Sequence, residues 1–178
     1  MDTDAANRAS SSKGSSDTRC CAPYFFTVRL EDHRSESLIE HIDTLRLAFR
    51  ACHDRYPFAM TAGVILPDHL HCILSLPSAD ASREARWRFI KQLFERVVDC
   101  GRDLWKPDFD ERRLDDDAEL SRQADKLHAD PVRHGLVRFP RDWAYSSFHA
   151  YVAHGLRPAY WCADASDAAG SRFAKQAA

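Results

Sequence analysis

The feature that most constrains the fold is a pair of apolar runs joined by a three-residue turn. Residues 58–66 (FAMTAGVIL) and 70–76 (LHCILSL) each have the length and the apolar character of a β-strand. Pro67, Asp68 and His69 separate the two runs, and proline presets the backbone angle φ that a tight turn requires. Because so short a connection joins antiparallel neighbours, the sequence predicts a β-hairpin.

Five further segments have the periodicity of a strand or a helix. Runs of β-branched and aromatic residues predict strands, and apolar residues three or four positions apart predict amphipathic helices. By these criteria the segments are a strand at 24–30, a helix at 35–55, a helix at 82–100, an extended piece at 104–109 and a helix at 115–135. The order is β-α-β-β-α, then a short extended piece, then α. This order favours an α+β fold in which helices cover an antiparallel sheet.

The chain is long enough for one domain, which is the default for 178 residues. Residues 1–20 are rich in Ser, Asp, Ala and Gly without a hydrophobic period, so we expect a disordered tail there. We expect the folded domain at 21–163 and a flexible tail at 164–178. No apolar run reaches the roughly 18 residues of a membrane span. Six cysteines without a CxxC pair fit the reduced thiols of a cytoplasmic protein.

The charge pattern gives no general argument for a nucleic-acid partner. The formal net charge is −2, whereas phosphate binding needs a local excess of Lys and Arg. Basic residues do cluster at 83–96 and 133–141, while 108–119 is acidic. Such clusters are either binding surfaces or ordinary solvated helix faces, and charge alone does not separate these alternatives.

His69 and His71 form the motif that carries chemistry, at the start of the second hairpin strand. Side chains alternate along a strand, so both imidazoles face the same side and Leu70 between them faces the core. Two neutral imidazoles can share a divalent cation such as Mn²⁺, although Mg²⁺ prefers oxygen ligands. A third ligand must come from another segment.

Six blocks occur in an order and spacing that resemble a known family. They are YFFTVRL, ILPDHLHCILSLP, RWRFIKQLF, LWKPDF, DPVRHGLV and DWAYSSFHAYVAHGLRPAYW, between Tyr24 and Trp161. These blocks resemble the REP-associated tyrosine transposases, a branch of the single-tyrosine HUH endonucleases. The resemblance implies a ferredoxin-like antiparallel sheet and a divalent metal ion, Mg²⁺ or Mn²⁺, held by the histidine pair. It also implies single-stranded DNA hairpins as partners, a monomer or homodimer, and a bacterial cytoplasmic location at the nucleoid.

The family's helix reads Tyr-Ile-x-x-Asn-Pro-Val-Lys-His-Gly, and residues 126–135 match it as KLHADPVRHG. The tyrosine that attacks the scissile phosphate in the family is matched here by Lys126, which cannot form a phosphotyrosyl link. Asp130 matches the third metal ligand, usually an amide residue. Glu111 matches an acidic residue near the family's site, although its neighbours Asp110 and Arg112 depart from the usual aromatic and histidine.

Two basic groups are candidates for DNA contact, in addition to Lys126. The first group lies in the helix at 82–100, where Trp87 is expected in the core, and the second follows Pro131. Their members are Arg83, Arg86, Arg88 and Lys91, and Arg133, His134 and Arg138. An ordinary solvent-exposed surface without a DNA partner would contain the same pattern of basic residues. His128 is expected to be a solvated helix-end histidine, and Tyr145 and Tyr151 to be packing residues.

Three hypotheses follow. The first is an active strand-nicking and strand-rejoining enzyme of DNA transposition, which needs a hydroxyl nucleophile. The second is a catalytically disarmed DNA-binding protein, which Lys126 favours. The third is a partner-binding protein that keeps only the fold.

Overall fold

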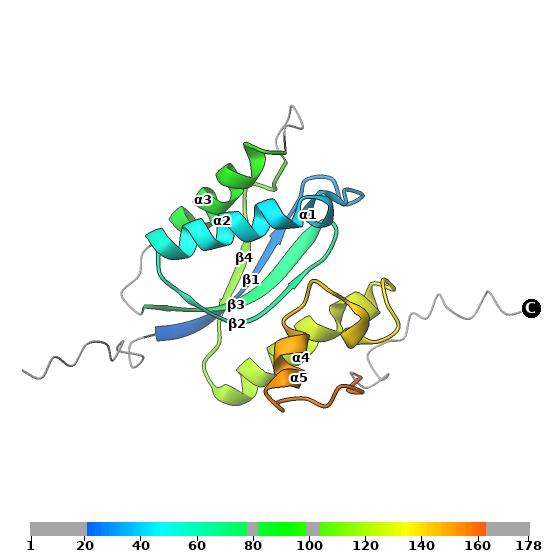
Figure 1. Cartoon of the computed structure of the whole chain (residues 1–178). Coiled ribbons are helices and arrows are strands. Elements are labelled where there is room, and N and C mark those ends of the chain that lie inside the picture. The colour runs from blue at the N-terminus through cyan, green and yellow to red at the C-terminus, as the bar shows by residue number, and fades with distance from the viewer. Residues whose placement is uncertain (1–20, 78–81, 99–103, 163–178) are drawn as a thin grey trace, which may run out of the picture.

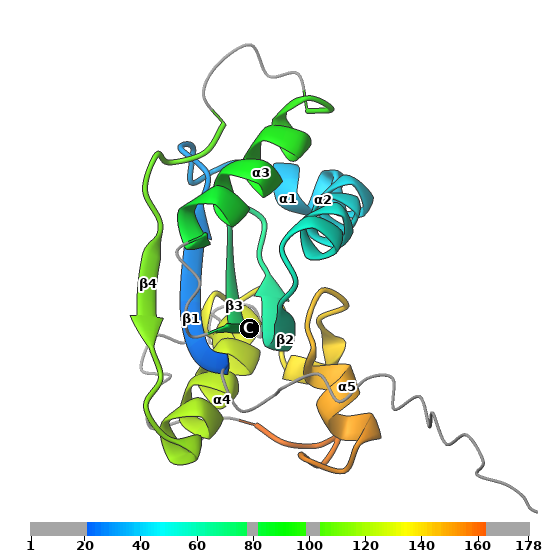
Figure 2. The same cartoon turned by 90° about the vertical axis from the view of Figure 1, so that its left-hand side faces the viewer.

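The centre of the protein is a four-stranded antiparallel sheet with strand order β2-β3-β1-β4. The computed structural model describes residues 21–77, 82–98 and 104–162. The strands are β1 (Cys21–Arg29), β2 (Ala59–Ile65), β3 (His69–Pro77) and β4 (Asp110–Arg113). Figure 2 shows them side by side, with β4 at one edge and β2 at the other. The predicted hairpin is β2 and β3, and the α+β fold is confirmed.

Helices cover both faces of the sheet (Figure 1). The helices of one face are α1 (Ser37–Glu40), α2 (Ile42–Arg55) and α3 (Arg83–Glu95). Those of the other face are α4 (Asp117–Arg133), the 3-10 helix η2 (Pro140–Asp142) and α5 (Phe148–Ala153). No helix within the described residues is long and apolar enough to cross a membrane.

Strand β3 contributes side chains to both faces. Leu70, Cys72 and Leu74 are buried in the core beneath α2 and α3. Ile73 belongs instead to the smaller core beneath α4. Because side chains alternate along a strand, His69 and His71 face α4 together with Ile73. The predicted orientation, with both imidazoles on one side and Leu70 in the core, is therefore confirmed.

Helix α4 is well defined at both ends. The carboxylate of its N-cap, Asp116, accepts a hydrogen bond from the backbone N–H of Glu119 at 2.6 Å, which satisfies one free amide of the first turn. At the other end the backbone N–H of His134 donates to the carbonyl of Asp130 at 2.9 Å. Gly135 then adopts φ of 71°, a left-handed conformation that glycine tolerates and that ends the helix. Pro131 lies inside the last turn of the helix.

The other element predictions differ from the structure in detail. The helix predicted at 35–55 is interrupted at His41, whose φ of −111° and ψ of 34° leave the helical region. The extended piece predicted at 104–109 forms only an isolated bridge from Trp105 to Leu30, and the ordered edge strand follows it as β4. Helix α3 ends at Glu95, short of the predicted end, and the predicted tails 1–20 and 164–178 lie outside the described residues.

Candidate metal centre and nucleic-acid interface

His69 and His71 lie on the inner strand β3 with their rings close together. The ring centroids are 5.0 Å apart and the ring planes are inclined by 79°. Nδ1 of His69 is 2.7 Å from Oδ1 of Asp68, and Nδ1 of His71 is 2.8 Å from Oγ1 of Thr27. A carboxylate can only accept, so Nδ1 of His69 donates this hydrogen bond. The orientation of each ring is therefore fixed by a hydrogen bond at Nδ1, as in metal sites where a second group orients each imidazole.

Asp130 brings a carboxylate from α4 to the pair. Its Oδ2 atom is 3.6 Å from Nε2 of His71, and its Oδ1 atom is 3.6 Å from Nη1 of Arg133. Burial raises the pKa of Asp130 to about 6, an effect that the positive charge of Arg133 opposes. Burial also lowers the pKa of His71 to about 3, and the nearby His69 lowers it further. At neutral pH the site therefore offers a neutral imidazole and an ionised carboxylate, the forms that bind metal ions.

Taken two at a time, these residues have the spacing of ligands of one divalent cation. Two imidazoles that bind one ion through Nε2 at about 2.1 Å have centroids roughly 4.5–5.2 Å apart. Two donor atoms of one ion lie roughly 3.0–3.6 Å apart at ligand angles of about 90–120°. Among the described residues, no group of three or more His, Cys, Asp or Glu side chains is arranged to hold an ion as it stands. His69 with His71, and His71 with Asp130, therefore have ligand spacing as pairs without forming a site of three ligands.

Lys126 is exposed on α4, one helical turn before Asp130. Residues four positions apart lie on the same face of a helix, so the ammonium group of Lys126 extends from the face that carries Asp130. A cation is thus placed on the face of α4 that carries Asp130.

Glu111 does not reach this site. In the register of β1 and β4, Glu111 pairs with Phe26 and Asp110 pairs with Thr27. Phe26 points into the core beneath α2 and α3, so Glu111 faces that side, where its carboxylate accepts a hydrogen bond from Arg83 at 3.0 Å. The prediction of Glu111 as a site residue is therefore corrected, because strand alternation turns it to the opposite face. Asp110 is the acidic residue on the histidine side, paired there with Arg29.

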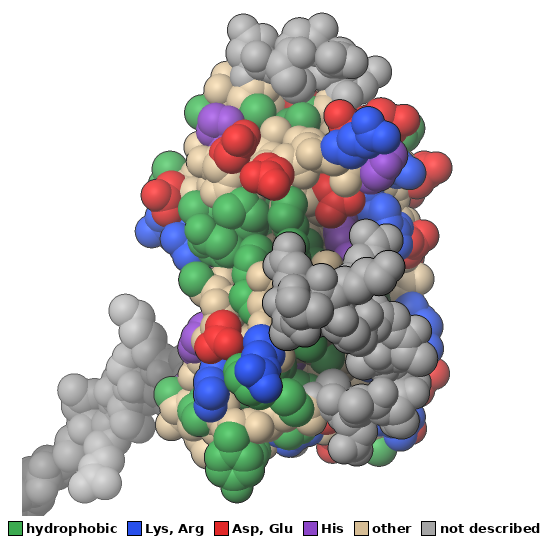
Figure 3. Space-filling view, turned by 90° about the vertical axis from the view of Figure 1, so that its right-hand side faces the viewer, with side chains coloured by type: hydrophobic (Ala, Val, Ile, Leu, Met, Phe, Trp, Pro, Cys, Tyr) green, Lys and Arg blue, Asp and Glu red, His purple; other side chains and the backbone are tan. Residues whose placement is uncertain are grey.

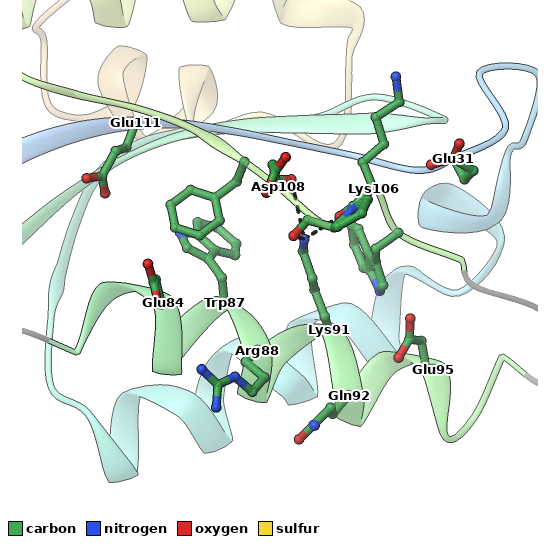
Figure 4. A pocket seen from close by; sticks show the side chains of 13 residues that line it. Glu31, Glu84, Trp87, Arg88, Lys91, Gln92, Glu95, Lys106, Asp108 and Glu111 are labelled. Carbon is green, nitrogen blue, oxygen red and sulfur yellow. Dashed lines mark hydrogen bonds between the residues drawn. The ribbon is translucent and has the colours of Figure 1, made fainter.

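The first basic group, on α3, also lies on the side of the sheet opposite the histidines. Arg86 is only 4% exposed, and its guanidinium donates to the carbonyls of Tyr56 and Pro57. Lys91 donates to the carbonyls of Lys106 at 2.6 Å and Pro107 at 3.2 Å (Figure 4). Arg86 is therefore not a candidate for DNA contact, since its guanidinium is bound to backbone carbonyls inside the protein. Trp87, predicted in the core, is 2% exposed.

The cavity beside α3 has the wrong charge for a phosphate chain. It has a volume of about 1090 Å³, and five carboxylate residues line it against three basic ones (Figure 4). The acidic residues are Glu31, Glu84, Glu95, Asp108 and Glu111, and the basic ones are Arg88, Lys91 and Lys106. Arg88 is exposed at its rim and Arg83 is paired with Glu111. This side of the sheet is a poor candidate for DNA contact.

The second basic group lies at the C-terminal end of α4, close to the histidine pair. Arg133, His134 and Arg138 are all exposed, and the ring centroid of His134 is 5.1 Å from that of His69. The charged side chains on the face seen in Figure 3 are of mixed sign, in keeping with the formal net charge of −2. The end of α4 is therefore the better candidate for a local phosphate-binding surface.

His128 is fully buried, so the prediction of a solvated histidine was wrong. Its Nε2 atom is 2.8 Å from Oγ of Ser147, and its ring packs against Phe148 and Tyr151. The same Ser147 Oγ accepts a hydrogen bond from the backbone N–H of Gly63 at 2.9 Å. Burial lowers the pKa of His128 to about 4, so the ring is neutral at physiological pH. Ser147 thus connects α4 to β2.

Replacing Ser147 by alanine is expected to lower the free energy of unfolding by about 2 kcal/mol, because two buried polar groups lose their partner. Urea unfolding followed by circular dichroism measures the change. Ser121→Ala is the matched control: Arg157 donates to Ser121 but keeps two hydrogen bonds to Asp125, so the loss should stay below about 0.5 kcal/mol. Equal effects of the two substitutions would contradict the role assigned to Ser147.

Tyr145 and Tyr151 have structural roles, as predicted. The ring of Tyr145 packs against Trp143 at 5.4 Å, and its carbonyl accepts from the backbone N–H of Ile65. The hydroxyl of Tyr151 donates to the carbonyl of Thr61 at 3.2 Å. Both residues therefore serve to pack the C-terminal segment against β2.

The sequence reasoning missed three residues around the histidine pair. Asp68 and Thr27 hold the two rings, and Arg29 pairs with His69 in the register of β1 and β3. Asp68 could have been found, since a carboxylate directly precedes the first histidine. Thr27 and Arg29 could not have been found in this way. Thr27 is 44 positions from His71 in the chain, and only the register of β1 and β3 brings the two residues together.

An antiparallel sheet with helices on both faces and an HxH pair on an inner strand is the arrangement of the HUH transposase class. No family model matches the chain. A REP-associated tyrosine transposase of Escherichia coli strain K12 is 38% identical over 152 residues, covering 84% of this chain and 91% of the relative. A REP-associated tyrosine transposase homologue of Haemophilus influenzae is 33% identical over 151 residues. The match covers 78% of this chain and 86% of the relative's length.

A solved structure agrees with the sequence relatives. The structure of a REP-associated tyrosine transposase bound to a REP hairpin superimposes with a TM-score of 0.77 at 37% identity. The match covers 85% of this chain and 92% of the other. The chain belongs to the family of REP-associated tyrosine transposases.

Proposed function

We propose that this protein binds single-stranded DNA hairpins of the REP type on the α4 side of its sheet. The support comes from the relative of 37% identity that was solved with a REP hairpin bound. It also comes from the exposed cations Lys126, Arg133 and Arg138, which lie on or just after α4. Arg29 on β1 faces the same side of the sheet as the histidine pair and adds a fourth cation, which is paired with Asp110. Phosphate contacts of this kind position a nucleic acid without reading its sequence.

The residues that would hold a divalent metal ion, Mg²⁺ or Mn²⁺, are His69, His71 and Asp130. Such an ion acts as a Lewis acid, which polarises a phosphate oxygen and neutralises its charge. Asp68 and Thr27 orient the two imidazoles from behind. The carboxylate of Asp130 would add a negative charge where the family usually has an amide.

We further propose that the protein does not cleave DNA, because Lys126 stands at the position of the family's tyrosine. This single substitution carries the proposal. A lysine has no hydroxyl with which to form a phosphotyrosyl bond, and its positive charge is better suited to hold a phosphate. Tyr151 is a poor substitute, since its hydroxyl is hydrogen-bonded to the carbonyl of Thr61. The function is then that of a disarmed transposase that retains hairpin binding.

The experiment is incubation of the purified chain with Mn²⁺ or Mg²⁺ and a pool of labelled single-stranded palindromic hairpins. Native gels report retention and denaturing gels report covalent adducts. We expect retention without adducts. A metal-dependent adduct would mean that another nucleophile serves and that the protein is an active strand transferase. A failure to retain hairpins at low salt would favour the third hypothesis, a partner-binding protein that keeps only the fold.

A further inference from the structure

A cavity of about 510 Å³ lies between α2 and the edge strand β2, and we call it the α2 cavity. Helix α2 forms one wall, and the segment 144–147 forms the other. The floor includes Leu70 and Cys72, which belong to the core beneath α2 and α3. His71 also borders the cavity, although its side chain points to the α4 side. The α2 cavity is therefore on the side of the sheet opposite the proposed DNA surface.

Much of the lining of the α2 cavity is apolar and fixed in position. The lining includes Phe49 and Tyr145, which make edge-on ring contacts with Trp87 at 5.9 Å and with Trp143 at 5.4 Å. Gly63 keeps part of the floor open. A Cβ atom at this position would lie 3.8 Å from Cβ of Cys72, so a larger side chain would extend into the cavity.

Exposed apolar side chains continue this surface outside the cavity. Met60 of the lining is 47% exposed, and Leu47 on α2 is 58% exposed. Leu47 is three positions before Arg50, which lines the cavity, so both lie on the same face of the helix. Methionine adapts its shape to different partners, and apolar patches beside a cavity are typical of surfaces that bind other proteins.

The charged residues that line the α2 cavity are basic. They are Arg46 and Arg50, and among the described residues no Asp or Glu lines the cavity. Arg46 is paired with Asp43 at 3.1 Å, whereas Arg50 is exposed and has no ion pair within the described part of the chain. The cavity beside α3 has the opposite character, with five carboxylate residues. The α2 cavity is therefore complementary to an apolar group that lies next to a negative charge.

We propose that the α2 cavity binds a short segment of a partner protein, in which an aromatic or aliphatic side chain fills the cavity and a neighbouring Asp or Glu pairs with Arg50. Side chains that fill such pockets supply most of the affinity of protein interfaces. A peptide suits this surface better than a small anion, because a peptide also covers Leu47 and Met60. This inference goes beyond the proposed function, since it gives the protein a second partner on the side of the sheet away from the DNA.

The test begins with selection of peptides that bind the full-length chain from a phage-displayed library of random short peptides. We expect the selected peptides to combine an aromatic or aliphatic residue with an acidic one. Fluorescence anisotropy with labelled copies of these peptides should show binding at least about 10-fold weaker to Arg50→Glu. Arg55→Glu is the matched control, because Arg55 is exposed on the same helix but does not line the cavity, and it should change the affinity less than about 2-fold.

Two further measurements separate a direct contact from a loss of folding. A peptide in which Lys replaces the acidic residue should bind Arg50→Glu more tightly than it binds the wild-type chain, a reversal that misfolding cannot produce. Gly63→Val should fill the cavity and weaken peptide binding at least about 10-fold without changing charge.

Three results would overturn the inference. The first is that the selected peptides bind Arg50→Glu as tightly as the wild-type chain. The second is that Arg50→Glu weakens hairpin binding as much as peptide binding, which would assign the α2 cavity to the DNA surface. The third is that the chain forms dimers that Arg50→Glu abolishes, which would make a second copy the occupant. Hairpin retention by the wild-type chain tests the proposed function separately.

Discussion

Replacing Lys126 by tyrosine is expected to restore covalent chemistry. The variant should form a protein–DNA adduct with a hairpin substrate in the presence of Mn²⁺, whereas the wild-type chain should form none. Lys126 is exposed on α4, one turn before Asp130, so a tyrosine there gains a hydroxyl on the face that carries the metal ligand. Because an enzyme without its nucleophile loses nearly all of its rate, we expect a gain of at least about 1,000-fold. Denaturing gels with labelled DNA measure the adduct.

Two further variants identify the cause of any adduct. Lys126→Phe introduces the same ring without the hydroxyl and should give no adduct. His71→Ala in the Lys126→Tyr background should abolish the adduct, since the metal pair is lost. If Lys126→Tyr binds both metal and hairpin but forms no adduct, the loss of tyrosine is not a sufficient explanation for inactivity. The departures at Asp110 and Arg112 would then become the candidates, because both residues face the α4 side of the sheet.

Most elements of this fold could be predicted because they have a local signal. The hairpin of β2 and β3 is marked by Pro67, and α4 is marked by its acidic first turn and by Gly135. The break at His41 had no such signal, because residues 35–55 keep their helical spacing of apolar side chains across it. Strand β4 was not predicted, because its sequence has no pattern typical of a strand. Its sequence, DERR, is entirely charged, and it is a strand only because β1 offers an edge with which it can pair.

The site was predictable only where one strand or one helix determines it. His69 and His71 share a face because strand residues alternate, and Lys126 and Asp130 share one because they are four positions apart in a helix. Which acidic residue of β4 faces the histidines depends on the register with β1, which brings Asp110 rather than Glu111 to that side.

The burial of single residues could not be predicted from the sequence either. Nothing local distinguishes Arg86, whose charge is committed to backbone carbonyls, from its exposed neighbour Arg88. His128 became a buried link because residues near the C-terminal end of the domain return to pack against α4. Its partner Ser147 is 19 positions further along the chain.

Reversing charge at the end of α4 is expected to remove most of the affinity for hairpin DNA. The double variant Lys126→Glu with Arg138→Glu should weaken binding roughly 100-fold or more at moderate salt, because two cations proposed to contact phosphate become anions. Both residues are exposed, and neither is among the proposed metal ligands. Fluorescence anisotropy with a labelled hairpin measures the dissociation constant. With alanine at either position, the slope of log K against log salt should fall by about 0.7–0.9 per lost contact.

The matched control makes the same change of charge on the opposite side of the sheet. Arg88→Glu with Arg96→Glu alters two exposed arginines on or just after α3, so it produces the same net charge without touching the histidine side. We expect it to weaken binding less than about 5-fold, through long-range repulsion alone. An equal loss in both double variants would mean that total charge, and not the α4 surface, controls binding. A larger loss in the α3 variant would place the hairpin beneath α3, where the acidic cavity makes a phosphate chain least favourable.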